Sequence, residues 1–249
     1  MTLDIATHKT LLFQILKDIY RDTTISPFLG FKGETAALMF YGLDRFSVDL
    51  DFDLLDEDKK DYVFQRMAAI ANQYGTIKES YIKRFSLFIV LSYEDKARHI
   101  KIEINRRQFG SRYEIKTYLG VSMQVMVIED MFAHKLMAMY ERIGKTSRDI
   151  YDVWFFLKSR FPINKEIVEN RAHLPFEELI NNCVNKLERM NNRQILDGVG
   201  ELLTTSQKDW VKARLREETI ALLKLRLGSC FIDDIVVEGE KPFGHINLV

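Results

Sequence analysis

The chain has 249 residues, 47% of them hydrophobic and 12% aromatic, enough to bury the core of one large domain or two small ones. It carries 36 basic and 36 acidic residues, so its overall charge does not steer it toward nucleic acid. No apolar run is long enough to span a membrane, and the first residues lack the features of a signal peptide. Two cysteines, Cys183 and Cys230, have neither metal-binding nor disulfide-framework spacing. We therefore expect a cytoplasmic protein without a membrane partner.

The first part of the chain predicts a helix, a short strand and a candidate anion site. Apolar residues recur at helical spacing from residue 4 to residue 21, and residues 28–31 are typical of a brief strand. Lys32 and Gly33 follow this strand, just before an apolar run, 36–40, that suits a short helix. A glycine turn that opens a helix exposes unpaired backbone N–H groups, which attract anions together with the helix dipole. With Lys32 beside it, this turn is a candidate phosphate site.

The next segment, Val48 to Leu54, alternates strictly between apolar and acidic residues. A strand turns successive side chains to opposite faces, so Asp49, Asp51 and Asp53 are expected on one face and the apolar residues in the core. Neighbouring carboxylates repel unless a cation neutralises them, and two at i and i+2 suit a hard divalent ion such as Mg²⁺. The alternative is a solvated edge strand with an acidic outer face. The nearby phosphate site favours the metal, because the two sites together would bind a metal–nucleoside triphosphate.

Residues 56–75 predict a helix, and residues 76–127 are strand-like. The strands are expected over residues 77–83, 86–92 and 98–105. In the last of these, isoleucines alternate with polar residues that include Glu103. If this strand lies beside the acidic strand, Glu103 completes a three-carboxylate site; taken alone, it is a surface residue. Arg98 to Arg112 holds five basic residues and could contact phosphates, although such runs are more often solvated surface.

After residue 127 the hydrophobic period becomes helical, which predicts a core domain over residues 1–127 and a helical domain over residues 128–249. Helices are expected over residues 129–143, 147–158, 164–171, 175–190, 193–204 and 207–227. Residues 229–249 are expected to form an extended tail that packs back, with a turn near Pro242 and Gly244. Strands followed by helices indicate the α+β class.

The first two of these helices carry charges at helical spacing. Lys135 and Arg142 lie on one side of the first helix. The second presents Asp149 and Asp152 together, with Arg148 four residues before Asp152 and able to pair with it. Spacing alone favours a salt-bridged helical hairpin without a site of its own.

The segment KGETAALMFYGLDRFSVDLDFDL, Lys32 to Leu54, resembles the signature of AbiEii/AbiGii-type toxin nucleotidyltransferases, which belong to the DNA polymerase β-like nucleotidyltransferase superfamily. The superfamily motif is a Gly-Gly or Gly-Ser turn followed by Asp-x-Asp, here Gly33-Glu34 and Asp49-Leu50-Asp51. Further agreement is found at Lys32, Thr35, Tyr41, Gly42, Arg45, Phe46, Ser47 and Phe52. Glu34 departs from the motif, because a carboxylate would repel a triphosphate unless it faces away, caps the helix or meets a metal.

The likeness extends to the later helices. His134 to Ala138, then Arg142 and the run Arg148 to Asp152, are similar to the family's Lys…Arg…Arg-Asp-x-x-Asp motif. This resemblance implies that Lys135 holds the phosphates and that Asp149 positions or deprotonates the acceptor, with Arg148 and Asp152 orienting them.

The resemblance covers residues 29–158 and implies a nucleotidyltransferase-like mixed β-sheet flanked by helices, followed by a mainly helical C-terminal domain. It implies a Mg²⁺-dependent enzyme that transfers a nucleotide from an NTP to RNA, such as a tRNA end. It further implies a toxin of a type IV toxin–antitoxin or abortive-infection system, with a separate antitoxin as partner. The metal ligands would be Asp49, Asp51 and Glu103. The phosphates would meet Lys32, Gly33, Thr35, Ser47, Lys135 and Arg148.

Two other functions remain open from the sequence. Asp51-Phe52-Asp53 with a later lysine and acids is also the pattern of a haloacid dehalogenase-like phosphatase, although Leu55 stands where that motif has Thr or Val. The other is a nucleotidyltransferase fold without catalysis that binds nucleotide, RNA or protein, which Glu34 supports.

Overall fold

The computed structural model describes residues 5–93 and 98–237 of the chain. The first half contains α1 (Ile5–Arg21), β1 (Leu29–Lys32), α2 (Gly33–Phe40), β2 (Leu50–Leu54), α3 (Lys60–Ala71), β3 (Thr76–Ile82), β4 (Ser86–Tyr93), β5 (Arg98–Asn105), β6 (Tyr113–Tyr118) and β7 (Val121–Met126). The second half contains α4 (Ile128–Arg142), α5 (Arg148–Lys158), α6 (Lys165–Ala172), α7 (Phe176–Arg189), α8 (Thr205–Trp210) and α9 (Arg216–Val237). No helix within these described ranges is long and apolar enough to cross a membrane.

The described strands form one seven-stranded mixed sheet in the order β3-β4-β5-β2-β1-β7-β6. The acidic strand β2 lies in the middle, antiparallel to β1 and parallel to β5. The alternative of a solvated edge strand is therefore wrong. The strand of Glu103 was expected to lie beside the acidic strand, and this is confirmed, because Asp51 pairs with Glu103.

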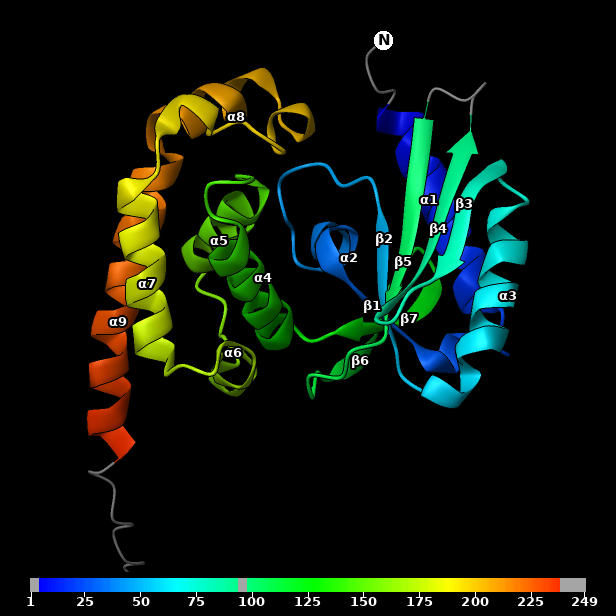
Figure 1. Cartoon of the computed structure of the whole chain (residues 1–249), viewed down its shortest axis with the longest axis horizontal. Helices are drawn as coiled ribbons and strands as arrows, with labels where there is room; N and C mark the ends of the chain where they lie inside the picture. Colours follow the sequence, from blue (N-terminus) through cyan, green and yellow to red (C-terminus); the bar gives the residue numbers. More distant parts are fainter. Residues whose placement is uncertain (1–4, 94–97, 238–249) are drawn as a thin grey trace, which may run out of the picture.

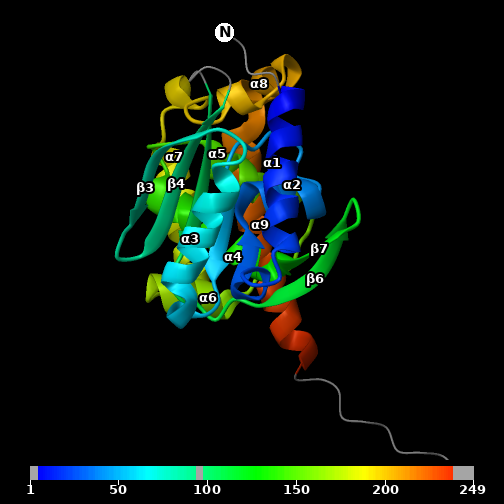
Figure 2. The same ribbon diagram turned by 90° about the vertical axis from the view of Figure 1, so that its right-hand side faces the viewer.

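The two faces of the sheet are covered differently. Figures 1 and 2 show α1 and α3 on one face, and α2 with the helices from α4 onward on the other. The apolar residues of β2, Leu50, Phe52 and Leu54, have 0% exposure, and Ile102 of β5 has 1%. They belong to the core that also contains Ile15 of α1, so the alternation of β2 separates a buried face from an acidic one. This confirms the expected α+β class, with a mixed sheet flanked by helices and followed by further helices.

The change from sheet to helices falls where the hydrophobic period predicts it, since β7 ends at Met126 and α4 begins at Ile128. The division into two domains at this point stays a prediction. The helix expected over residues 193–204 is wrong, because that segment contains only 3₁₀ turns, at Asn192–Gln194 and Gly200–Leu202. Gly198, with φ +73°, has a left-handed conformation that an α-helix cannot contain.

The extended segment expected from residue 229 is also wrong as far as the structure describes it. Helix α9 passes through Gly228 and continues to Val237. A single glycine weakens a helix by only about 1 kcal/mol, and no proline follows it within α9. Residues 238–249, with Pro242 and Gly244, lie outside the described residues.

Gly30 of β1 leaves room for the ring of Tyr113. A β-carbon at Gly30 would lie 2.2 Å from Cε1 of Tyr113. The hydroxyl of Tyr113 donates a hydrogen bond to Asp53, which pairs with Gly30 across the sheet. We expect Gly30→Ala to lower the free energy of unfolding by about 1–3 kcal/mol, because overpacking displaces this ring. Gly228→Ala is the control: a β-carbon there meets no atom within 4 Å, and stability should be unchanged or rise by up to about 1 kcal/mol.

Urea denaturation of both variants measures the difference. A Gly30→Ala protein as stable as the wild type would contradict the packing described here.

Candidate active site

The predicted metal ligands lie close to one another on the acidic face of the sheet. Asp51 of β2 pairs with Glu103 of β5 on one side and with Lys32 of β1 on the other. Paired residues present their side chains on the same face, so these three side chains form a line across three strands. Asp49 directly precedes β2, and its carboxylate accepts a hydrogen bond from the backbone N–H of Lys101 at 3.4 Å. Asp49, Asp51 and Glu103 together are called the carboxylate site below.

Two of these carboxylates lack partners. Neither Asp51 nor Glu103 has a hydrogen bond or ion pair among the described residues. Burial raises the pKa of Asp51 to about 7, and the negative charges of Glu34 and Asp49 act in the same direction. A carboxylate whose ionised form is disfavoured by burial and that forms no ion pair is a group that a divalent ion would stabilise.

The glycine of the motif lies directly against Asp51. Gly33 has φ +77°, a conformation that favours glycine, and a β-carbon on it would lie 2.3 Å from Oδ2 of Asp51. Gly33 is also the first residue of α2, so the unpaired N–H groups of this helix start lie beside the carboxylate site. An anion and a cation can therefore meet at this point.

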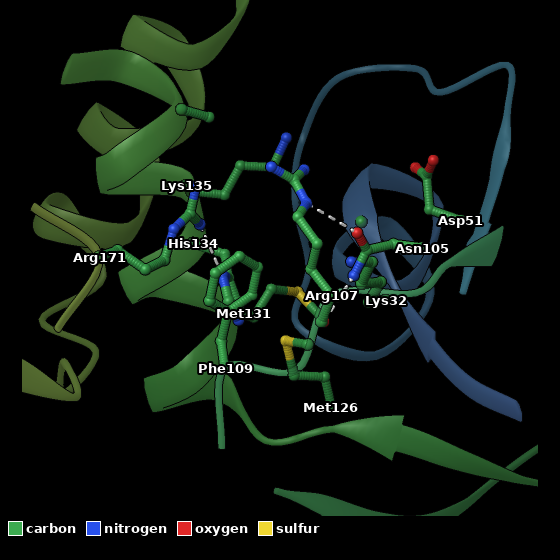
Figure 3. A pocket seen from close by; sticks show the side chains of 12 residues that line it. Lys32, Asp51, Asn105, Arg107, Phe109, Met126, Met131, His134, Lys135 and Arg171 are labelled. Atoms are coloured by element: carbon green, nitrogen blue, oxygen red, sulfur yellow. Dashed lines mark hydrogen bonds between the residues drawn. The ribbon is translucent and has the colours of Figure 1, made fainter. Parts of the chain in front are cut away.

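A cavity lies between the sheet and the helices α4 and α6 (Figure 3). It is lined from the sheet by Lys32, Gly33, Asp51 and Asn105, and from the helices by Met131, His134, Lys135, Ala138 and Arg171, with Arg107, Phe109 and Met126 between them. The guanidinium groups of Arg107 and Arg171 lie 5.6 and 4.7 Å from the ring centroid of Phe109. Positive charge thus gathers beside Asp51, as binding of a polyphosphate requires.

Apart from Arg107, the basic residues between Arg98 and Arg112 whose side chains the structure describes do not line this cavity. Arg106 forms an ion pair with Glu57, and Arg112 forms one with Asp130 at 3.1 Å. The side chain of Arg98 lies outside the described part of the chain. Within this run, Arg107 is therefore the residue placed to contact phosphate in the cavity.

The third acid of the alternating strand has a structural role. The carboxylate of Asp53 is buried and accepts hydrogen bonds from Lys32 at 2.6 Å, from Nδ2 of Asn105 at 2.6 Å and from the hydroxyl of Tyr113. These donors satisfy the charge of Asp53. They also hold Lys32, a predicted phosphate ligand, at the edge of the cavity.

Thr35 and Ser47, two predicted phosphate ligands, contact each other. Their hydroxyl oxygens are buried and 2.8 Å apart, and Thr35 also donates to the backbone carbonyl of Asp49. Both line a separate pocket against α1 rather than the cavity beside Asp51. The observed contacts fix the chain just before β2 and so position Asp49; contact with phosphate stays a prediction for both residues.

Glu34, which departs from the motif, lies among cations. Its carboxylate is 2.8 Å from Nζ of Lys135, 3.0 Å from Arg45 and 3.3 Å from Arg148. Burial opposes its ionisation, but the charges of Lys135, Arg45 and Arg148 outweigh burial and hold the pKa of Glu34 well below its usual range. Glu34 is therefore ionised and neutralised, and its repulsion of a triphosphate is reduced.

The same cations reach the two aspartates of α5. Arg45 is fully buried and donates to both oxygens of Asp152, at 2.6 and 2.7 Å. Lys135 is 2.8 Å from Asp152 and 3.8 Å from Asp149, and Arg142 is 3.1 Å from Asp149. We call these groups, with Glu34 and Arg148, the ion-pair network.

One contact differs from the spacing-based expectation. Arg148 pairs with Glu34 rather than with Asp152, because Arg45 already takes both oxygens of Asp152. Lys135 and Arg142 do lie on one side of α4, where both approach Asp149.

Glu34, Asp149 and Asp152 place oxygen atoms within 4.8 Å of one another, a group with metal-ligand spacing among the described residues. A metal ion there would have to displace Lys135 and Arg45, which already neutralise these acids. The carboxylate site is not as tightly gathered, but its Asp51 and Glu103 have no cation to displace. The donor set there fits a hard divalent ion better.

We expect Asp152→Asn to lower the free energy of unfolding by about 3–5 kcal/mol, because it breaks the buried ion pairs of Asp152 with Arg45 and Lys135 and leaves Glu34 as the remaining counter-charge of Arg45. The control is Glu188→Gln, which breaks a 2.8 Å ion pair with Lys224 whose side chains are 47% and 56% exposed. That change should cost less than about 1 kcal/mol. Denaturant unfolding of both variants tests this, and similar losses for the two would contradict the assigned burial.

His134 makes the stability of the site sensitive to acid. Arg171 donates to Nδ1 at 2.8 Å, so Nε2 keeps the proton and donates to Ser111 at 2.7 Å. Burial, with the positive charges of Lys32 and Arg171, lowers the pKa of His134 to about 3. Its usual value is about 6.5, so below that pH the unfolded chain takes up a proton that the folded chain refuses.

The contribution of His134 to stability is thus complete above about pH 6.5 and is lost as the pH falls toward 3, by at most about 1.4 kcal/mol per pH unit. We expect His134→Asn to flatten the dependence of the melting temperature on pH in this range. An unchanged slope would show that His134 titrates alike in both states.

Phe109, His134 and Arg171 line the cavity but were not predicted as site residues from the sequence. They come from three separate segments, and no local pattern joins them. A fold that brings the β5–β6 connection against α4 and α6 is what places them around one cavity.

The family profile described as "Nucleotidyl transferase AbiEii toxin, Type IV TA system" matches residues 14–218 of the chain. The fold is similar to the crystal structure of JHP933 from Helicobacter pylori, with a TM-score of 0.62 and 18% identity over 96% of this chain and 98% of that one. A candidate nucleotidyltransferase from H. pylori has a TM-score of 0.59 and 21% identity over 93% and 98%. An antigenic nucleotidyltransferase-like protein from Paracoccidioides brasiliensis has a TM-score of 0.50 and 14% identity over 75% and 90%.

None of the curated proteins matches the chain in sequence. At these identities the solved structures show a shared fold, whereas the family profile covers most of the chain and carries the assignment. The chain is a nucleotidyltransferase and belongs to the AbiEii toxin family of type IV toxin–antitoxin systems.

Proposed function

We propose that the protein transfers a nucleoside monophosphate from an NTP to an RNA acceptor, such as a tRNA end, in a Mg²⁺-dependent reaction. We further propose that it acts as a cytoplasmic toxin in phage defence and that a separate antitoxin restrains it. The observation that carries the catalytic proposal is the position of Asp51. This partner-free carboxylate lies between Glu103 and the Gly33 turn and lines the cationic cavity.

The carboxylate site fits Mg²⁺, because its donors are hard oxygen atoms and two of them have no other partner. Asp49, Asp51 and Glu103 would hold the ion or a pair of ions. When bound, such ions supply positive charge that stabilises the attacking and the leaving oxygen. The rest of the chemistry falls to the chain's own side chains and backbone.

The triphosphate would lie along the cavity. The N–H groups at the start of α2 would donate to one phosphate, and Lys32, Arg107 and Arg171 would add positive charge from the walls. Lys135 lines the same cavity from α4, and its ion pairs with Glu34 and Asp152 hold its ammonium in place. This arrangement prepares the charges before substrate enters, which is how a site stabilises charge without reorganising.

In the transfer step, the oxygen of the acceptor hydroxyl forms a bond to the α-phosphorus. The bond from this phosphorus to the oxygen that bridges to the β-phosphate breaks, pyrophosphate leaves, and the hydroxyl proton is released to water. Asp149 is buried between Arg142 and Lys135. Those contacts suit the positioning role predicted for it, since it lies between Arg142 and Lys135, and Lys135 lines the cavity.

The two other functions left open by the sequence, a phosphatase and a fold without catalysis, are less well supported than nucleotide transfer. Membership of the AbiEii family and the sheet order exclude a haloacid dehalogenase-like phosphatase. Glu34, the main feature that favoured a fold without catalysis, is neutralised by three cations.

We expect Asp51→Asn to reduce transfer of label from an α-³²P NTP to total bacterial RNA by about 100-fold or more, because the carboxylate site loses a charge at the reacting phosphate. Chelation by EDTA should abolish the transfer and added Mg²⁺ should restore it. Asp61→Asn, which changes a side chain that is 71% exposed on α3, is the matched control and should keep full activity. The assay is run with each of the four NTPs in turn.

Label on RNA from one preferred NTP, lost in Asp51→Asn, would support the proposal and identify the donor. Equal labelling by Asp51→Asn, or no labelling by the wild type with any NTP, would contradict it.

A further inference from the structure

The line of side chains through the carboxylate site continues toward the edge of the sheet. Glu103 of β5 pairs with Phe88 of β4, and Phe88 pairs with Tyr81 of β3. Asp51, Glu103, Phe88 and Tyr81 therefore lie side by side on one face. The two rings are stacked, with centroids 5.0 Å apart and an interplanar angle of 19°, and Nζ of Lys83 lies 4.8 Å from the centroid of Tyr81.

This face is not the one that packs into the core. The alternate residues of β4, Leu87, Ile89 and Leu91, are at most 1% exposed, whereas Phe88 and Tyr81 are half-buried. Figures 1 and 2 show that α1 and α3 lie on the opposite face of the sheet. An aromatic surface under a lysine is thus accessible next to the third acid of the carboxylate site.

We propose that Tyr81, Phe88 and Lys83 form a stacking platform for the single-stranded end of the acceptor RNA. This inference rests on the proposed function and adds to it the place and the form of the acceptor. Unpaired bases stack on aromatic side chains with little regard to sequence, whereas paired bases have their faces covered. Lys83, at the border of the platform, adds a charge for the phosphate backbone.

The direction of the reaction assigns this platform to the acceptor rather than to the NTP. The Gly33 turn and Lys32 lie on the β1 side of Asp51, whereas Arg107, which also lines the cavity, follows the end of β5, beyond Asn105. In-line transfer requires the attacking oxygen on the side of the α-phosphorus opposite the leaving pyrophosphate. With pyrophosphate on the Gly33 side, the acceptor hydroxyl approaches from the side of Glu103, where Phe88 is the next residue across the sheet.

A stacked cross-strand pair also stabilises a hairpin, so the test must separate binding from folding. The full chain is titrated into a fluorescent single-stranded oligoribonucleotide, with a blunt RNA duplex of the same sequence in parallel. Tyr81→Leu/Phe88→Leu should weaken binding of the single strand by roughly 5- to 150-fold per lost stacked base. The exchange Tyr81→Phe/Phe88→Tyr keeps both rings and should bind like the wild type.

Two further variants keep the test valid if the double leucine variant folds poorly. Lys83→Glu changes an exposed residue of the turn, and should also weaken binding of the single strand, most at low salt. Tyr62→Leu, which removes a 45% exposed aromatic residue on α3, should leave binding unchanged. Melting temperatures of all variants report whether each is folded.

Preference of the wild type for the single strand, lost in the double leucine and Lys83→Glu variants, would support the platform. Equal binding by these variants, or no preference for the single strand, would overturn it, even if the wild type labels RNA. Transfer of label to protein rather than RNA would also overturn it. Failure of the proposed function gives a different result. In that case the wild type would not label RNA, although its binding of the oligonucleotides would still follow the expected pattern.

Discussion

A buried pair between Arg45 and Asp152 is the contact on which the site depends. Arg45 belongs to the connection between α2 and β2, and Asp152 belongs to α5, so the pair joins the motif to the C-terminal helices. Breaking a buried ion pair costs about 3–5 kcal/mol, because a buried charge loses a partner that compensates for its removal from water. The motif turn and the cavity wall of α4 are therefore held in one arrangement, in which Glu34 and Lys135 meet across the cavity rim.

The active site contains two groups of acids, those of the ion-pair network and those of the carboxylate site, and the pKa values of Glu34 in the first and Asp51 in the second are shifted in opposite directions. Three cations surround Glu34 and hold its pKa well below its usual range despite burial, whereas burial and neighbouring carboxylates raise the pKa of Asp51 to about 7. The ion-pair network is therefore complete without a metal, and the carboxylate site is not. This contrast explains why a motif with a glutamate in its glycine turn can still leave the neighbouring site suited to a metal–triphosphate.

The sequence predicted the parts of the site that follow from local periodicity. Alternation in β2 and β5 put Asp51 and Glu103 on polar faces, and the resemblance indicated Lys135 and Asp149 on helices. Contacts between distant segments were not predictable from spacing: Arg45 displaced Arg148 from Asp152, and the strand register that aligns Phe88 with Glu103 depends on tertiary packing. The 3₁₀ turns in residues 193–204 show the same limit, since helical spacing was present but Gly198 has a left-handed conformation.

We propose that the carboxylate site, rather than the ion-pair network, holds the cation. The most direct measurement is a crystal structure of the protein with Mn²⁺, in place of Mg²⁺, and a non-hydrolysable NTP, with the metal located by anomalous scattering. We expect the anomalous peak between Asp49, Asp51 and Glu103, with the triphosphate running from the Gly33 turn into the cavity. A peak among Glu34, Asp149 and Asp152, with Lys135 displaced, would contradict the account.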